Sequence, residues 1–62
     1  MNWKLKERIC EIFRTQIDFA QRIGKSESKV SLIVRGRRVL SPEDKQRWAK
    51  LLNCEIEDIF ED

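Results

Sequence analysis

The sequence predicts an all-α fold, with five short helices packed into one compact domain over residues 1–62. Three observations support this prediction. Apolar residues recur at the three- and four-residue spacing of a buried helix face. Serine, threonine and proline mark helix starts, and glycine or asparagine marks helix ends. The chain shows neither an alternating strand pattern nor a linker. At 62 residues it is near the lower limit for folding alone, so its core must be efficient or shared with a partner.

We expect the helices at about residues 3–13, 16–23, 26–35, 42–52 and 55–60. In the first helix, Leu5, Ile9, Ile12 and Phe13 form one apolar stripe. Trp3 precedes the stripe and either folds over it or stays free for a partner.

The second and third expected helices have clear boundary signals. Thr15 is the expected N-cap of the second helix, and Ser26 is the expected N-cap of the third. Gly24 ends the second helix because glycine adopts positive φ without a Cβ clash. Gly36 ends the third helix in the same way.

The apolar residues of these two helices predict a steep crossing. Phe19, Ala20 and Ile23 face inward from the second helix, and Val30 and Ile33 face inward from the third. The small Ala20 side chain lets the two helices approach closely. This arrangement is that of a helix-turn-helix, whose second helix enters the major groove of DNA.

Ser41 and Pro42 predict the start of the fourth helix, since serine caps the helix and proline fits its first position. The side chains expected to face the core from this helix are Trp48, Ala49, Leu51 and Leu52. Asn53 is a plausible left-handed stop. In the last helix, the apolar residues Ile56, Ile59 and Phe60 either seal the core of one monomer or form a dimer surface.

Charge is distributed unevenly along the chain. Residues 25–38 contain five basic residues and one acidic residue, a net charge of +4. Residues 39–62 contain three basic and seven acidic residues, a net charge of −4. The basic segment coincides with the expected groove-facing helix and the loop after it, which favours nucleic-acid binding.

Other classes of protein are disfavoured. No apolar run approaches the ~20 residues of a membrane span, and no signal peptide is apparent, so we expect a cytoplasmic protein. The chain has no histidine, and Cys10 and Cys54 are its only cysteines, which we expect to be ordinary apolar side chains rather than a disulfide. We therefore expect no metal, cofactor, small-molecule ligand or catalytic residue, and hence no enzyme.

The helix-turn-helix and its surroundings follow a known pattern. Its residues are Gln16, Ala20, Gly24, Val30, Ser31, Ile33, Gly36, Arg37 and Arg38. The pattern continues through Ser41-Pro42, the run from Trp48 to Leu52, and residues 56–60. In this order and spacing, the chain resembles the Cro/C1-type (XRE-like) helix-turn-helix regulators over residues 5–60. The resemblance implies a compact five-helix lambda-repressor-like domain, prokaryotic or from a phage, that binds DNA and regulates transcription.

Three positions depart from the family pattern. Lys25 replaces the usual apolar turn residue, so its stem must cover the core while its amine reaches water. Val34-Arg35 replaces an acidic residue and an asparagine, which adds positive charge at the end of the third helix. Asn53 replaces the common glycine.

The outward face of the third helix supplies the candidate base contacts Glu27, Ser28, Lys29 and Leu32. Glu27 accepts a hydrogen bond from a cytosine amine or only stabilises the positive end of the helix. Ser28 can donate or accept. Lys29 reaches a guanine or a phosphate. Leu32 contacts a thymine methyl group or is simply an exposed leucine.

The candidate phosphate contacts are Gln16, Ser26, Ser31, Arg35, Arg37 and Arg38. The resemblance implies that Gln16 hydrogen-bonds a phosphate at the start of the second helix; otherwise it is a neutral helix-start residue. The three arginines either clamp phosphates, which gives salt-sensitive affinity, or are solvated charges.

The leading hypothesis is a sequence-specific double-stranded DNA-binding transcription regulator, a small phage-type or bacterial repressor. The alternative is a protein-interaction module of the same fold, antitoxin-like or anti-repressor-like, that has lost DNA binding. A role in RNA binding stays open, although no aromatic stacking platform is visible. Regulators of this kind usually pair, so we expect a homodimer, free or only on DNA.

Overall fold

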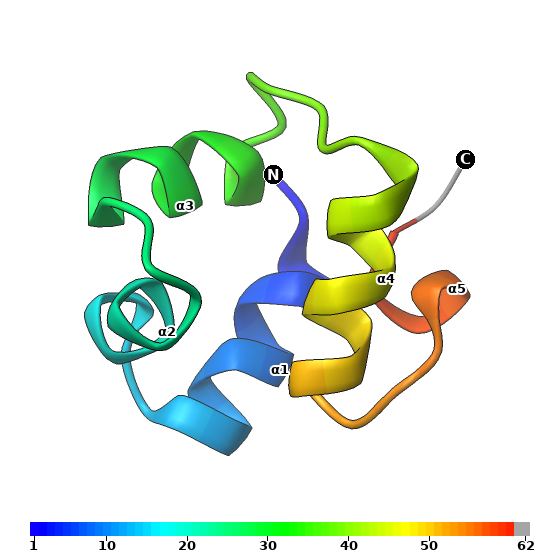
Figure 1. The fold of residues 1–62 in the computed structure, drawn as a ribbon, viewed down its shortest axis with the longest axis horizontal. Helices are drawn as coiled ribbons and strands as arrows, with labels where there is room; N and C mark the ends of the chain where they lie inside the picture. Colours follow the sequence, from blue (N-terminus) through cyan, green and yellow to red (C-terminus); the bar gives the residue numbers. More distant parts are fainter. Residues whose placement is uncertain (61–62) are drawn as a thin grey trace.

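The structure, a computed structural model, describes residues 1–60, which form five α-helices and no strand. The helices are α1 (Trp3–Phe13), α2 (Gln16–Ile23), α3 (Glu27–Val34), α4 (Pro42–Leu51) and α5 (Ile56–Ile59) (Figure 1). The all-α prediction is confirmed. α3, α4 and α5 are slightly shorter than expected because flanking residues act as caps: Ser26 precedes α3, Leu52 follows α4, and Glu55 precedes α5.

The predicted N-caps all form. The hydroxyl groups of Thr15, Ser26 and Ser41 accept hydrogen bonds from backbone N–H groups three residues on, at 3.1, 3.3 and 3.2 Å. Asn2, which was not predicted as a cap, does the same for α1 by accepting from the Leu5 N–H at 3.0 Å. Each bond pairs one of the backbone donors that the first turn of a helix leaves unpaired.

Left-handed residues end three of the helices. Gly24, Gly36 and Asn53 have φ values of 72°, 79° and 56°. At each position two backbone N–H groups turn back to carbonyls of the last helical turn, as in Gly36 to Ile33 and Arg37 to Leu32 at 3.1 and 2.9 Å. This Schellman arrangement satisfies carbonyls that would otherwise lack partners. The predicted stops at Gly24, Gly36 and Asn53 are therefore confirmed.

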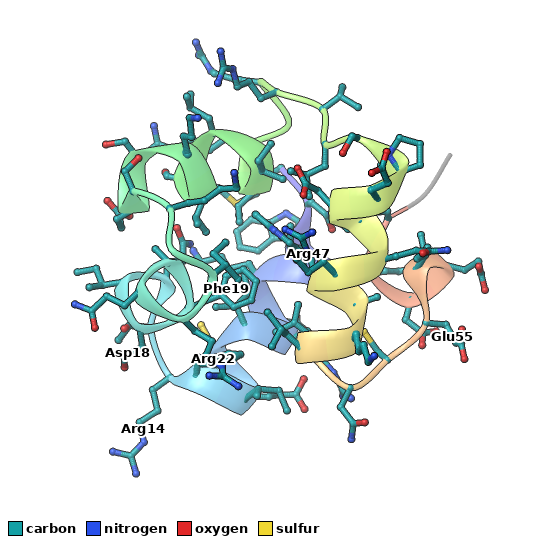
Figure 2. The ribbon with its side chains drawn as sticks, viewed as in Figure 1. Arg14, Asp18, Phe19, Arg22, Arg47 and Glu55 are labelled. Carbon is teal, nitrogen blue, oxygen red and sulfur yellow. The ribbon has the colours of Figure 1, made fainter. Side chains whose placement is uncertain are left out.

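Aromatic rings form the centre of the core. Phe19 of α2 meets Trp48 of α4 edge-on, with ring centroids 4.9 Å apart. Phe13 and Phe60 extend this contact at either end, at 5.2 Å from Phe19 and 6.4 Å from Trp48. Figure 2 shows Phe19 between α2 and α4 in the middle of the molecule. Each edge-to-face pair stabilises the fold by about 0.5–1.5 kcal/mol beyond the effect of the area it buries. The row of rings connects α1, α2 and α4 with the residue that follows α5.

All five helices contribute to one apolar core. Its fully buried residues include Leu5 and Ile9 of α1, and Ala49 and Leu52 at the end of α4. No buried polar or charged side chain occurs within residues 1–60.

The structure corrects one expectation for α1 and decides between the two alternatives for Trp3. Ile12 was expected in the apolar stripe, but it is 44% exposed, although helix geometry places it within about 20° of Leu5. Phe13, beside it in the last turn of α1, packs against the core instead. Trp3 does not fold over the stripe. It is 60% exposed, and the Lys6 ammonium group lies 5.2 Å from its ring centroid.

The apolar residues of α5 belong to the core. Ile59 is buried, and the half-buried Ile56 and Phe60 pack against the core. Of the two interpretations of these residues, the structure supports the sealing of one monomer.

Two polar side chains tie the first helix to the end of the chain. The Arg8 guanidinium group donates to the carbonyls of Leu52 and Asn53 at 2.8 and 2.7 Å. The Asn2 side chain donates to the Ile59 carbonyl at 2.5 Å, and the Asn2 backbone N–H donates to the Val34 carbonyl at 2.7 Å. Asn2 therefore links α1 to α5 and to the last turn of α3.

No helix within residues 1–60 has the length and apolarity to cross a membrane. Both cysteines are free thiols. Cys10 is exposed. Burial raises the pKa of the half-buried Cys54 thiol, and the nearby Arg8 charge opposes this shift.

Replacing Arg8 by methionine is expected to lower the free energy of unfolding by about 2 kcal/mol, because two charge-assisted hydrogen bonds to the end of α4 are lost. Urea unfolding followed by circular dichroism measures this change. Arg22→Met, at an exposed position, is the matched control and should change the free energy by less than about 0.5 kcal/mol. Equal effects of the two substitutions would contradict the role of Arg8.

Arg14 adopts φ 71° and ψ −49° between α1 and α2, and the Thr15 N–H donates to the Phe13 carbonyl at 2.8 Å. Its side chain points away from the body of the molecule (Figure 2). Such a three-residue turn with positive φ is strained for any residue with a Cβ. Arg14→Gly should therefore stabilise the protein by about 1 kcal/mol, a rise in melting temperature of about 5 °C.

The control is Arg14→Ala, which removes the guanidinium group and keeps the strain. Thermal unfolding of the two variants isolates the backbone effect. A glycine variant that melts below the alanine variant would show that the turn is not strained.

Candidate nucleic-acid interface

One side of α3 is buried in the core. Val30 and Ile33 face inward as predicted, and Val34 joins them at 1% exposed. The sequence analysis missed Val34 as a core residue, although its spacing of four from Val30 places it on the same helix face. α3 crosses α2 steeply, since α2 is seen nearly end-on in Figure 1 while α3 runs across the view.

The other side of α3 faces away from the core. Ser28 and Arg35 are exposed, as expected for the outward face. Leu32 differs from the expectation of a fully exposed leucine, because it is half-buried. The Arg37 N–H donates to the Leu32 carbonyl at 2.9 Å and brings the chain back beside this residue. Leu32 keeps a partly exposed side chain near the middle of the outward face.

A hollow of about 370 Å³ flanks α3 on the side of α1 and the start of α2. We call it the Gln16 hollow. It brings together four of the candidate DNA contacts, which are Gln16, Glu27, Ser31 and Arg35. Lys6 and Cys10 line the same space from α1.

A second hollow, of about 520 Å³, lies on the opposite flank of α3, beneath the loop that leads to α4. We call it the basic hollow. Its rim carries Lys25, Lys29, Arg37 and Arg38, of which the sequence analysis had named the last three. Ile33, Leu40 and Trp48 contribute apolar surface.

The basic hollow concentrates positive charge. Asp44 is the single acidic residue among the described residues that line it, and its carboxylate lies 3.9 Å from the Arg47 guanidinium group. All four basic residues of the rim are exposed. Concentrated cations beside a protruding helix attract a polyanion strongly at low salt.

The remaining candidate residues lie at the N-terminal end of α3. The Ser26 hydroxyl accepts a hydrogen bond from the Lys29 N–H, which occupies one of its lone pairs and leaves its O–H free to donate. Glu27 lies in the first turn of α3 and is exposed. Ser28 and Leu32 thus form a ridge along the outward side of α3, and most of the other candidate residues line the hollow on either side of it.

The lining residues that were not predicted as site residues include Lys6, Lys25 and Ser41. The sequence could have indicated Lys25 as a site residue, because a lysine is unusual at a turn position that is normally apolar. Lys6 carried no such signal, because only the fold brings α1 beside α3.

Within the described part of the chain, no three His, Cys, Asp or Glu side chains form a group that could hold a metal ion.

A comparison with known protein families finds one matching model, described as helix-turn-helix, over residues 5–59. No curated protein and no solved structure matches the chain significantly. Proteins of this family are typically non-catalytic, and membership implies DNA as the partner and a role in transcription regulation. The match covers nearly the whole chain, and α2 and α3 have the geometry that the family name describes. The chain therefore belongs to the Cro/C1-type (XRE) helix-turn-helix family.

Proposed function

We propose that this domain binds double-stranded DNA sequence-specifically, with α3 in the major groove. The observation that carries the proposal is the two-sided surface of α3: one face is buried, and the other forms a ridge between two polar hollows. A major groove about 12 Å wide accepts a single α-helix of this kind.

The proposed base contacts are Glu27, Ser28, Lys29 and Leu32, which occupy or border the ridge. Glu27 is suited to accept from a cytosine amine, Lys29 to donate to guanine, and Leu32 to contact a thymine methyl group. Ser28 can take either part in a hydrogen bond and therefore tolerates several bases.

The proposed phosphate contacts lie on both flanks. They are Gln16, Ser26, Ser31 and Arg35 toward α2, and Arg37 and Arg38 in the loop after α3. Contacts on both sides of one helix would hold the two phosphate backbones that border a groove, and so fix the register of docking.

In the cell, the proposed role is that of a small bacterial or phage repressor, which blocks a promoter by occupying it. We further propose that two copies pair on DNA rather than free in solution, because Ile59 and its neighbours in α5 are used inside the monomer. Selection of bound duplexes from a random pool tests sequence-specific binding and pairing on DNA, and analytical ultracentrifugation without duplex tests whether the free protein is a monomer. An inverted repeat with half-site centres about one helical turn apart is expected. A single isolated half-site would contradict pairing.

The alternative of a protein-interaction module relied on Ile56, Ile59, Phe60, Leu32 and Trp3. The burial of Ile59 and the packing of Ile56 and Phe60 argue against it. Trp3 remains exposed, but it lies outside the ridge and both hollows, and we favour DNA binding.

Changing Arg37 and Arg38 together to alanine is expected to weaken duplex binding. The slope of log K against the logarithm of the salt concentration should become shallower by about 1.8, because each lost phosphate contact removes about 0.9 from it. Fluorescence anisotropy titrations between 50 and 200 mM salt measure this change. The control changes two exposed basic residues in the last turns of α2 and α4, Arg22 and Lys50, to alanine. A wild-type domain that is folded and binds no duplex at low salt would end the proposal.

Leu32 gives a separate prediction about sequence preference. Replacing the contacted thymine of a selected duplex by deoxyuridine, which lacks the methyl group, should weaken wild-type binding about fourfold, since one buried carbon group contributes about 0.8 kcal/mol. Leu32→Ala should bind both duplexes equally. If wild type binds thymine and deoxyuridine duplexes alike at every position, Leu32 contacts no methyl group.

A further inference from the structure

Lys25 lies in the turn between α2 and α3, where hydrogen bonds fix the position of its backbone. Its N–H donates to the Ala20 carbonyl at 3.0 Å, and the preceding Gly24 N–H donates to the Gln21 carbonyl at 3.3 Å. These two bonds hold the backbone from which the side chain starts. The Lys25 side chain is exposed and lines the basic hollow together with Lys29, Arg37 and Arg38.

The surroundings of Lys25 suit a long amphipathic side chain. Ile33 and Trp48 are nearly covered, and Leu40 is half-buried, so the hollow has an apolar floor. The methylene stem of a lysine can lie along such a floor while its ammonium group extends to the rim. An apolar residue at this position would cover the floor equally well, so packing alone does not require the charge.

The basic hollow holds more positive charge than its own residues balance. Four cations line it, and the single lining carboxylate, on Asp44, already lies within ion-pair distance of Arg47. Like charges that share one rim repel each other, and an anion placed among them removes the repulsion. The rim borders the flank of α3 where a phosphate backbone would run.

We propose that Lys25 is a positioning residue of the DNA complex, whose ammonium group, with the guanidinium groups of Arg37 and Arg38, holds a backbone phosphate at the basic hollow. This inference rests on the proposed function and adds to it a contact from the turn itself. The contact places a charge on the element that joins the two helices, and so holds the turn, as well as α3, against the DNA.

One substitution at Lys25 should raise the melting temperature and lower the affinity for duplex DNA. Lys25→Leu supplies an apolar side chain for the floor and removes a repelled charge, so its melting temperature should rise by about 4 °C. The same variant should bind duplex more weakly than wild type. A residue with only a structural role would not separate the two readouts.

The test compares wild type, Lys25→Ala, Lys25→Leu, Lys25→Arg and the control Lys50→Ala on one selected duplex from 50 to 200 mM salt. In Lys25→Ala and Lys25→Leu, the slope of log K against the logarithm of the salt concentration should be shallower by about 0.9. The ratio of wild-type to variant affinity should therefore fall about 3.5-fold between 50 and 200 mM salt. Lys25→Arg keeps the charge and should match wild type, as should Lys50→Ala.

The outcomes distinguish a failure of the proposed role of Lys25 from a failure of DNA binding itself. If wild type binds duplex and Lys25→Ala has the same slope as Lys50→Ala, the role of Lys25 is wrong while DNA binding stands. If the folded wild-type domain binds no duplex at 50 mM salt, the proposed function fails and the role of Lys25 fails with it. Circular dichroism of each variant confirms folding before the titrations.

Discussion

The burial of one face of α3 is the constraint on which the rest of the molecule depends. A helix of eight residues is too short to be stable alone in water, so its existence and its direction both come from packing. Val30, Ile33 and Val34 supply that packing and leave the opposite face toward solvent. The outward ridge and the two hollows beside it follow from this division of α3 into two faces.

Much of the fold could be predicted because it is encoded locally. Caps at Thr15, Ser26 and Ser41 and stops at Gly24 and Asn53 depend on the chemistry of single residues, and each is seen in the structure. The steep crossing of α2 and α3 could also be predicted, since it needs only a short turn and two apolar faces. Membership of the helix-turn-helix family was recognisable from the same spacing.

The errors concern the edges of apolar faces and contacts between distant segments. Whether Ile12 or Leu32 is covered depends on where neighbouring elements end, and a single helix does not contain that information. The strained turn at Arg14 is set by how α1 and α2 must meet, which overrides the preference of the residue. Lys6 lies beside α3 for the same reason, because only the tertiary fold brings these helices together. The individual base and phosphate contacts stay predictions.

The two clusters of charge lie apart in the folded molecule. Glu55, which precedes α5, lies across the molecule from α3 (Figure 2), whereas four basic residues line the hollow formed by α3 and the loop that follows. A dipolar distribution of this kind orients a protein as it approaches a polyanion, and it presents the basic end first. The small net charge of +2 therefore understates the attraction of the basic hollow to a polyanion.

The hydrogen bonds of Asn2 also bear on the order in which the molecule is completed. This residue joins the end of α3 to the Ile59 carbonyl, 57 positions away. During synthesis the first residues leave the ribosome long before Ile59 does, and contacts so distant in sequence form late. A chain that does not yet extend to Ile59 lacks both this hydrogen bond and the buried Ile59 side chain. The link that Asn2 makes between the end of α3 and α5 therefore forms only after Ile59 has been made.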